Sequence, residues 1–106
     1  MEEAAAVRKA QADQLVRIVG AAGRPLIGGG DFNSPPDSYA CRRMNEELRS
    51  AFAAAGSGFG WSFPSSDPLL RIDHLFASDD LDVLDCLVLP TRASDHCPLV
   101  ADFAWR

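Results

Sequence analysis

The sequence lacks a set of cysteines that would pair with one another. Cys41, Cys86 and Cys97 are an odd number and show no C-x-x-C spacing. This pattern is typical neither of a disulfide framework nor of a zinc cluster. We therefore expect three buried thiols in a reducing compartment.

Long apolar runs and targeting signals are also missing. No stretch approaches the roughly 18 apolar residues that a transmembrane helix needs. Met1 is followed by two glutamates instead of a basic segment and an apolar one. We expect no membrane segment and a cytoplasmic location, with the reservation that a signal peptide would belong to a preceding segment.

Positive charge is scarce as well. Ten Lys and Arg residues stand against 15 Asp and Glu residues, which gives a formal net charge of -5. Such a surface repels phosphate polyanions, so nonspecific nucleic-acid binding by this chain is disfavoured. A divalent cation between carboxylates and substrate lets an acidic site handle phosphates. The charge balance is therefore mildly in favour of a metal site.

The composition that remains is that of a globular protein. Hydrophobic residues make up 47% of the 106 residues and charged residues 24%, which predicts a packed core and one small domain. We treat residues 1–106 as a single unit.

The order of elements along the chain predicts an α/β fold. A helix is expected from about Glu2 to Ala22, ended by Gly23 and Pro25, and a second helix from the N-cap Ser38 to about Ala55. The apolar stripe expected on the first helix consists of Val7, Leu15, Ile18, Val19 and Ala22, and that on the second of Cys41, Met44, Leu48, Ala51 and Phe52. Strands are expected at 25–30, which should be buried and lead into the loop 31–37, and at 70–76, 83–89 and 97–105, with a short extended piece at 61–63. Helices and strands in this order favour a mixed sheet layered with helices.

The first candidate site is Gly30-Asp31-Phe32-Asn33, at the end of the first strand. Ligands of α/β sheets collect beyond strand ends. Asp31 would offer carboxylate oxygens to a metal or to the proton of a water, and Asn33 an amide to a phosphoryl oxygen. The alternative is a turn in which both side chains bond their own backbone.

Two further segments combine an aspartate with a histidine. Asp73 lies inside an otherwise apolar strand, where a carboxylate needs a partner, and Arg71 or a backbone N–H is the plain alternative to a functional one. Asp95 and His96 precede the last strand, and adjacent residues on extended backbone point opposite ways. One of them would meet a metal and the other Asp73, although S-D-H is also a common loop tripeptide. The joint occurrence of all three segments is far more specific than any one alone.

Together these segments resemble the endonuclease/exonuclease/phosphatase superfamily. Its C-terminal signature of G-D-F-N, R-I-D and S-D-H-x-P stands here as residues 30–33, 71–73 and 94–98. The resemblance extends to a helix with Arg and Gln before the first motif and to a G-x-[ST]-[FY] element at 60–63. It implies a layered α/β sandwich of the DNase I-like type, of which this chain supplies about half of the full four-layer domain.

The resemblance also implies roles for individual residues. Asp31 would orient and deprotonate the attacking water, and Asn33 would hold the phosphate near the metal. Asp73 would fix one ring nitrogen of His96, which would stabilise or protonate the phosphoryl group. Asp95 would bind Mg²⁺ or Mn²⁺, with Asp31, Asn33 and His96 around the same ion. The implied activity is a divalent-metal-dependent phosphoester hydrolase, a nuclease, phosphodiesterase or phosphatase, acting on nucleic acid or on a small phosphoester.

The chain departs from the family in having no N-terminal half. That half supplies an Asn, a metal-binding Glu and usually a further His or Tyr, and Glu2 and Glu3 do not replace them because the expected strand motifs are absent. A sheet that should pack on a partner sheet would leave an apolar face exposed. We therefore expect self-association or a need for the missing half. The alternatives are a catalytically incomplete fragment that keeps the fold and binds a metal or partner, and a purely structural α/β module.

Overall fold

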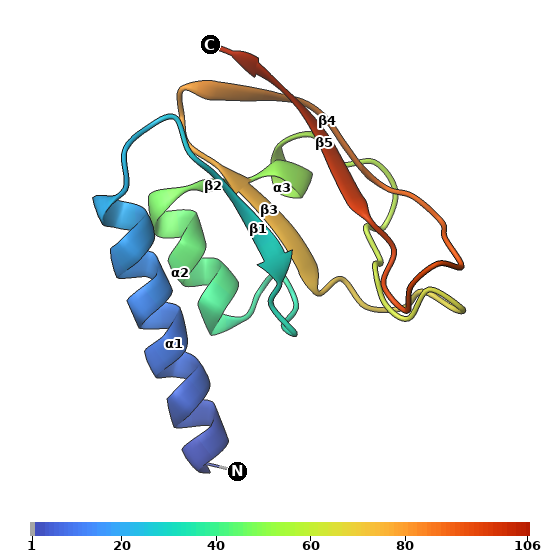
Figure 1. Cartoon of the computed structure of the whole chain (residues 1–106), viewed down its shortest axis with the longest axis horizontal. Coiled ribbons are helices and arrows are strands. Elements are labelled where there is room, and N and C mark those ends of the chain that lie inside the picture. Colours follow the sequence, from blue (N-terminus) through green and yellow to red (C-terminus); the bar gives the residue numbers. More distant parts are fainter. Residues whose placement is uncertain (1) are drawn as a thin grey trace.

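The computed structural model describes residues 2–106, and the side chains of Glu2 and Glu3 lie outside the described part. In chain order the elements are α1 (Glu2–Ala21), β1 (Ile27–Asp31), α2 (Tyr39–Glu47), β2 (Arg49–Ser50), α3 (Ala51–Ala55), β3 (Asp73–Ala77), β4 (Leu81–Val88) and β5 (Leu99–Trp105). Helices α1 and α2 run side by side along one side of the molecule, and β4 and β5 lie on the other side (Figure 1). The predicted α/β class with helices layered on sheet is confirmed.

The strands form two antiparallel sheets. The first has the order β1-β3-β2, and the second consists of β4 and β5. The side chains of β3 alternate between two surroundings, as extended backbone requires. Phe76 belongs to the core under the helices, whereas Asp73 and Leu75 line a hollow that the start of β5 also lines. The first sheet thus has one face on the helices and one face toward β5.

The core lies between the two long helices and the first sheet. Its buried members are Val16, Val19, Cys41, Met44, Leu48 and Phe76. Ser38 begins α2 as predicted, because its side-chain oxygen accepts a hydrogen bond from the backbone N–H of Cys41. Tyr39 donates a hydrogen bond to Asp13, which ties α2 to α1. Apolar burial and this contact together hold the helix pair on the sheet.

The predicted stripe on the first helix is partly wrong. Val19 is buried, but Ile18 is 60% exposed and Val7 is exposed too, while Ala12 and Val16 complete the buried row. The row 12, 16 and 19 is the one that can meet α2. The other apolar residues stay in solvent because α1 is covered on that flank only.

The second predicted helix is interrupted. Leu48 has extended backbone with φ -131° and ψ 172°, and Arg49 and Ser50 then pair with β3. The Ser50 side chain accepts a hydrogen bond from the N–H of Ala53 and so begins α3. Pairing with β3 has therefore overridden the helical periodicity of the sequence.

The prediction that β1 is buried is also wrong. Ile27 is 48% exposed, and only Gly28 in this strand is half-buried. β1 is an edge strand, paired with β3 on one side and with no other strand of the described chain. Gly29 packs so close to Leu75 of β3 that a Cβ at this position would collide with it.

All three cysteines are buried and free, as predicted. Among residues 2–106, no helix has the length and apolar character needed to cross a membrane.

Candidate active site

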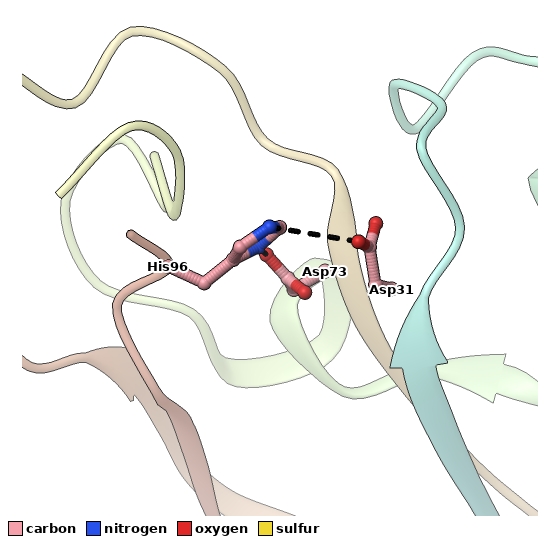
Figure 2. A group of neighbouring side chains, drawn as sticks. All are labelled: Asp31, Asp73 and His96. Atoms are coloured by element: carbon pink, nitrogen blue, oxygen red, sulfur yellow. Dashed lines mark hydrogen bonds and ion pairs between the residues drawn. The ribbon is translucent and has the colours of Figure 1, made fainter. Parts of the chain in front are cut away.

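Three ionisable side chains converge from three parts of the chain (Figure 2). Asp31 is the last residue of β1, Asp73 is the first residue of β3, and His96 lies in the loop before β5. The β1–β3 register places Asp31 directly opposite Asp73. One ligand atom from each of the three residues lies within 4.8 Å of the others. Two facing carboxylates repel each other, so a positive charge between them is favoured.

The imidazole of His96 lies between the two carboxylates. Its Nδ1 is 2.7 Å from Oδ2 of Asp73, and its Nε2 is 3.5 Å from Oδ2 of Asp31. The hydrogen bond with Asp73 raises the pKa of His96, and the charges of Asp31 and Asp95 act in the same direction against partial burial. When Nδ1–H donates to Asp73, the ring is held in one orientation and Nε2 points toward Asp31.

A buried serine holds this arrangement in place. Ser62 is fully buried, and its Oγ accepts hydrogen bonds from the N–H groups of Ile72 and Asp73 at 3.4 and 3.3 Å. Its carbonyl accepts the N–H of Cys97 at 2.7 Å. Ser62 therefore connects the start of β3 to the residue after His96. This role of Ser62 was not predicted from the sequence, although the G-x-[ST]-[FY] element at 60–63 contained the signal.

Asp31 and Asn33 form the turn that was the alternative to a site. The N–H of Asn33 donates to Oδ1 of Asp31 at 2.8 Å, and Asn33 has a positive φ of 48°. Asn33 is exposed. The turn does not exclude a functional role for Asp31, because its other oxygen faces His96.

Asp95 lies outside the group of three. It is exposed, and its Oδ1 is 3.4 Å from the hydroxyl of Ser94. Its carbonyl accepts the N–H of Ser65 at 2.7 Å, which fixes the loop. The structure thus brings Asp31, Asp73 and His96 together and leaves Asp95 beside them.

Arg71, the other partner considered for Asp73, has a different neighbour. Its guanidinium carbon lies 4.2 Å from the centre of the Phe52 ring. Within the described residues it forms no ion pair with Asp73, whose side-chain partner is His96.

The site opens into a hollow of about 370 Å³ between the two sheets. Besides the three site residues, its lining consists of Gly30, His74, Leu75, Ser94, Cys97, Pro98 and Leu99. The lining thus combines apolar side chains with a few ionisable groups, which is a common character of small-ligand sites.

Comparisons with known proteins identify the family. The model of the endonuclease/exonuclease/phosphatase family matches residues 2–96. A comparison with curated proteins found no match.

Several solved structures share the fold. An endonuclease/exonuclease/phosphatase from Bacteroides vulgatus has a TM-score of 0.77 at 23% sequence identity. The alignment covers 93% of the present chain and 44% of the Bacteroides vulgatus chain. The mannosyl-6-phosphatase Bt3783 of Bacteroides thetaiotaomicron has a TM-score of 0.72 at 19% sequence identity. The alignment covers 92% of the present chain and 44% of the phosphatase chain. The human Nocturnin catalytic domain with bound sulfate has a TM-score of 0.72 at 28% sequence identity. The alignment covers 94% of the present chain and 42% of the Nocturnin chain.

This chain spans less than half the length of each of these structures. The predicted layered fold of the DNase I-like type, about half of which is present, is confirmed. Because the family model matches nearly the whole sequence, the chain belongs to the endonuclease/exonuclease/phosphatase family.

Proposed function

We propose that this chain carries the C-terminal half of a divalent-metal-dependent phosphoester hydrolase site. The observation that carries the proposal is the position of His96 between Asp73 and Asp31, with Nδ1 bonded to one carboxylate and Nε2 3.5 Å from the other. An imidazole oriented in this way has one nitrogen available for a substrate oxygen. Substrates are phosphoesters, either nucleic acid or small molecules.

Each residue has a distinct part in the proposed reaction. Asp31 orients the attacking water and accepts its proton, and the amide of Asn33 donates to a phosphoryl oxygen. Asp73 keeps His96 in one tautomer. His96, whose pKa is raised, donates from Nε2 to the phosphoryl group as negative charge develops there.

The donor set fits a hard divalent ion. Asp31 and Asp73 supply carboxylate oxygens near an imidazole nitrogen, and Asp95 is an exposed carboxylate next to His96. Mg²⁺ and Mn²⁺ prefer oxygen ligands and keep several waters, so Asp31, Asn33 and Asp95 are the proposed ligands. His96, expected from the sequence to bind the same ion, has no nitrogen left for it when Nδ1 bonds to Asp73 and Nε2 donates to the phosphoryl group. When bound, the ion neutralises charge on the phosphate and on the leaving oxygen.

A second candidate is a catalytically incomplete unit that keeps the fold and binds a metal or a partner. It is favoured by the coverage of only 42 to 44% of the matched structures and by the open edge of β1. Exposed large hydrophobic residues occur on both sheets and include Ile27, Leu84, Val100 and Trp105. A missing half or a second copy would cover such surfaces.

One assay distinguishes the hydrolase from the catalytically incomplete unit. Hydrolysis of bis(p-nitrophenyl) phosphate and of a duplex with an abasic site is measured with Mg²⁺ and with Mn²⁺, for the chain and for the double variant Asp31→Ala, His96→Ala. Metal-dependent turnover that disappears in the double variant supports the hydrolase. A folded chain that binds Mn²⁺ without turnover supports the incomplete unit.

A further inference from the structure

Two aromatic rings lie stacked and exposed on the loop before β3. The centres of the Phe59 and Trp61 rings are 4.5 Å apart, and the ring planes differ by 13°. Phe59 is 73% exposed and Trp61 is 39% exposed. A parallel pair of this kind leaves one flat ring face open to solvent.

The loop that presents these rings is held by specific contacts. Gly58 and Gly60 have φ values of 76° and 72°, which other residues rarely adopt. A Cβ at Gly60 would also meet Phe52 and Arg71 at under 3 Å. The N–H of Ser57 donates to the carbonyl of Cys86 at 3.0 Å, so the loop is fixed to β4. The exposed rings are therefore held in place by the fold.

The stacked pair lies near the candidate active site, because Cys97, the residue after His96, lines both the hollow beside the rings and the hollow of the site. Trp61 and Phe63 flank the buried Ser62, and alternate residues of an extended segment point the same way. The Phe63 ring packs against His96, with the ring centres 4.7 Å apart and the ring planes tilted by 43°. Trp61 therefore lies in the same short segment as a ring that contacts the candidate catalytic imidazole.

The surface beside the rings suits a sugar. Phe59 and Trp61 line a hollow of about 270 Å³ together with Pro68 and Pro90. Pro90 also borders a second hollow, whose other residues are Ser65, Ser66, Thr91 and Arg92. These hydroxyls and the guanidinium offer hydrogen bonds to hydroxyl groups next to the ring stack.

We propose that Phe59 and Trp61 form a stacking platform that selects phosphoesters carrying a planar heteroaromatic ring, with a nucleotide base as the occupant. The inference rests on the proposed function, because the phosphate of the same ligand is placed at His96. Base stacking on aromatic side chains uses the π-face that every base has, and the stacking itself does not depend on positive charge on the protein. It is therefore compatible with a net charge of -5.

The test compares two ligands that differ only in the ring. Binding of AMP and of ribose 5-phosphate is measured by isothermal titration calorimetry with Mg²⁺ present, which reports both ligands whether or not they contact an aromatic ring. We expect AMP to bind roughly tenfold more tightly than ribose 5-phosphate. Phe59→Leu, which keeps an apolar side chain but removes the ring, should abolish most of this preference. Ribose 5-phosphate should bind the variant unchanged.

Matched controls separate the platform from a protein interface. Leu84→Ala removes a side chain of similar exposure on β4 and should leave the AMP preference intact. Equal affinity for the two ligands, or an AMP affinity unchanged by Phe59→Leu, would overturn the proposal. Sedimentation that shows dimers lost in Phe59→Ala without any AMP preference would also overturn it, because the rings would then be a surface between copies.

The proposal and the hydrolase function fail in different ways. An AMP preference without turnover of bis(p-nitrophenyl) phosphate keeps the platform and removes the hydrolase function for this chain. Metal-dependent turnover with no AMP preference removes the platform and keeps the hydrolase.

Discussion

The two histidines of this chain each follow an aspartate, yet their surroundings are opposite. His74 is 4% exposed, its Nε2 lies 2.7 Å from the carbonyl of Ser34, and its ring meets the edge of Phe32. His96 is partly exposed and lies between two carboxylates. Burial lowers the pKa of His74, whereas the hydrogen bond with Asp73 raises that of His96. The same dipeptide therefore has a packing role in one place and a candidate chemical role in the other.

The largest expected difference between the two histidines is in turnover. In a preparation that hydrolyses bis(p-nitrophenyl) phosphate, His96→Ala should lower the rate by roughly 10²- to 10⁴-fold, as loss of general acid catalysis does. His74→Gln keeps a donor for the Ser34 carbonyl and should change the rate no more than a few-fold. A comparable loss in both variants, with circular dichroism unchanged, would contradict the distinction.

The two histidines should rank in the opposite order in their effect on the free energy of unfolding. His74→Ala removes a buried ring that contacts Phe32 and Phe76, and should lower the free energy of unfolding by about 2–3 kcal/mol. His96→Ala should cost less than about 1 kcal/mol, because exposed ion pairs contribute little. Urea denaturation of both variants measures the difference, and equal costs would refute it.

Substitution of Ser62 should change the environment of the His96 ring more than that of the His74 ring. Ser62→Ala removes a buried acceptor for the N–H groups of Ile72 and Asp73, so we expect a loss of about 1–2 kcal/mol in unfolding free energy. The NMR chemical shifts of the His96 ring should also change in the Ser62→Ala variant. Ser78→Ala, which removes another buried serine whose Oγ accepts a backbone N–H, that of Leu26, serves as the control. An unchanged His96 signal would show that Ser62 does not position this residue.

The smallest effect is a difference in pH dependence. The folded-state pKa of His74 lies below its unfolded value, so the unfolded chain binds the proton more readily and stability falls as the pH drops below roughly 6.5. The pKa of His96 is raised, so its contribution is present at acidic pH and is lost as the pH rises through its folded-state pKa. Urea unfolding from pH 5 to 8 with EDTA, for His74→Gln, His96→Gln and the parent chain, measures both slopes. Identical slopes in the three proteins would contradict the opposite signs.

Features that depend on local sequence were predictable here. Ser38 as an N-cap and the α/β class followed from residue type and spacing. The motifs around Asp31, Asp73 and His96 led to the family, and the structure places these three side chains together. Their roles and the metal ligands, including Asp95 and Asn33, remain predictions.

Features that depend on distant partners were not predictable. The break after Leu48 requires pairing of Arg49 and Ser50 with β3, which periodicity does not contain. The exposure of β1 depends on the strand that is absent from its outer edge. The function of Ser62 depends on contacts with Asp73 and Cys97, which are 11 and 35 positions away in the sequence.

The register of β1 against β3 has a consequence for errors in folding. Three successive glycines offer few side chains to specify the pairing, and a slip of one residue would turn Asp31 to the opposite face of the sheet. The close fit of Gly29 on Leu75 opposes such a slip. A chain with the wrong pairing would therefore separate its carboxylate pair while its core stays buried, because β1 supplies none of the buried core residues.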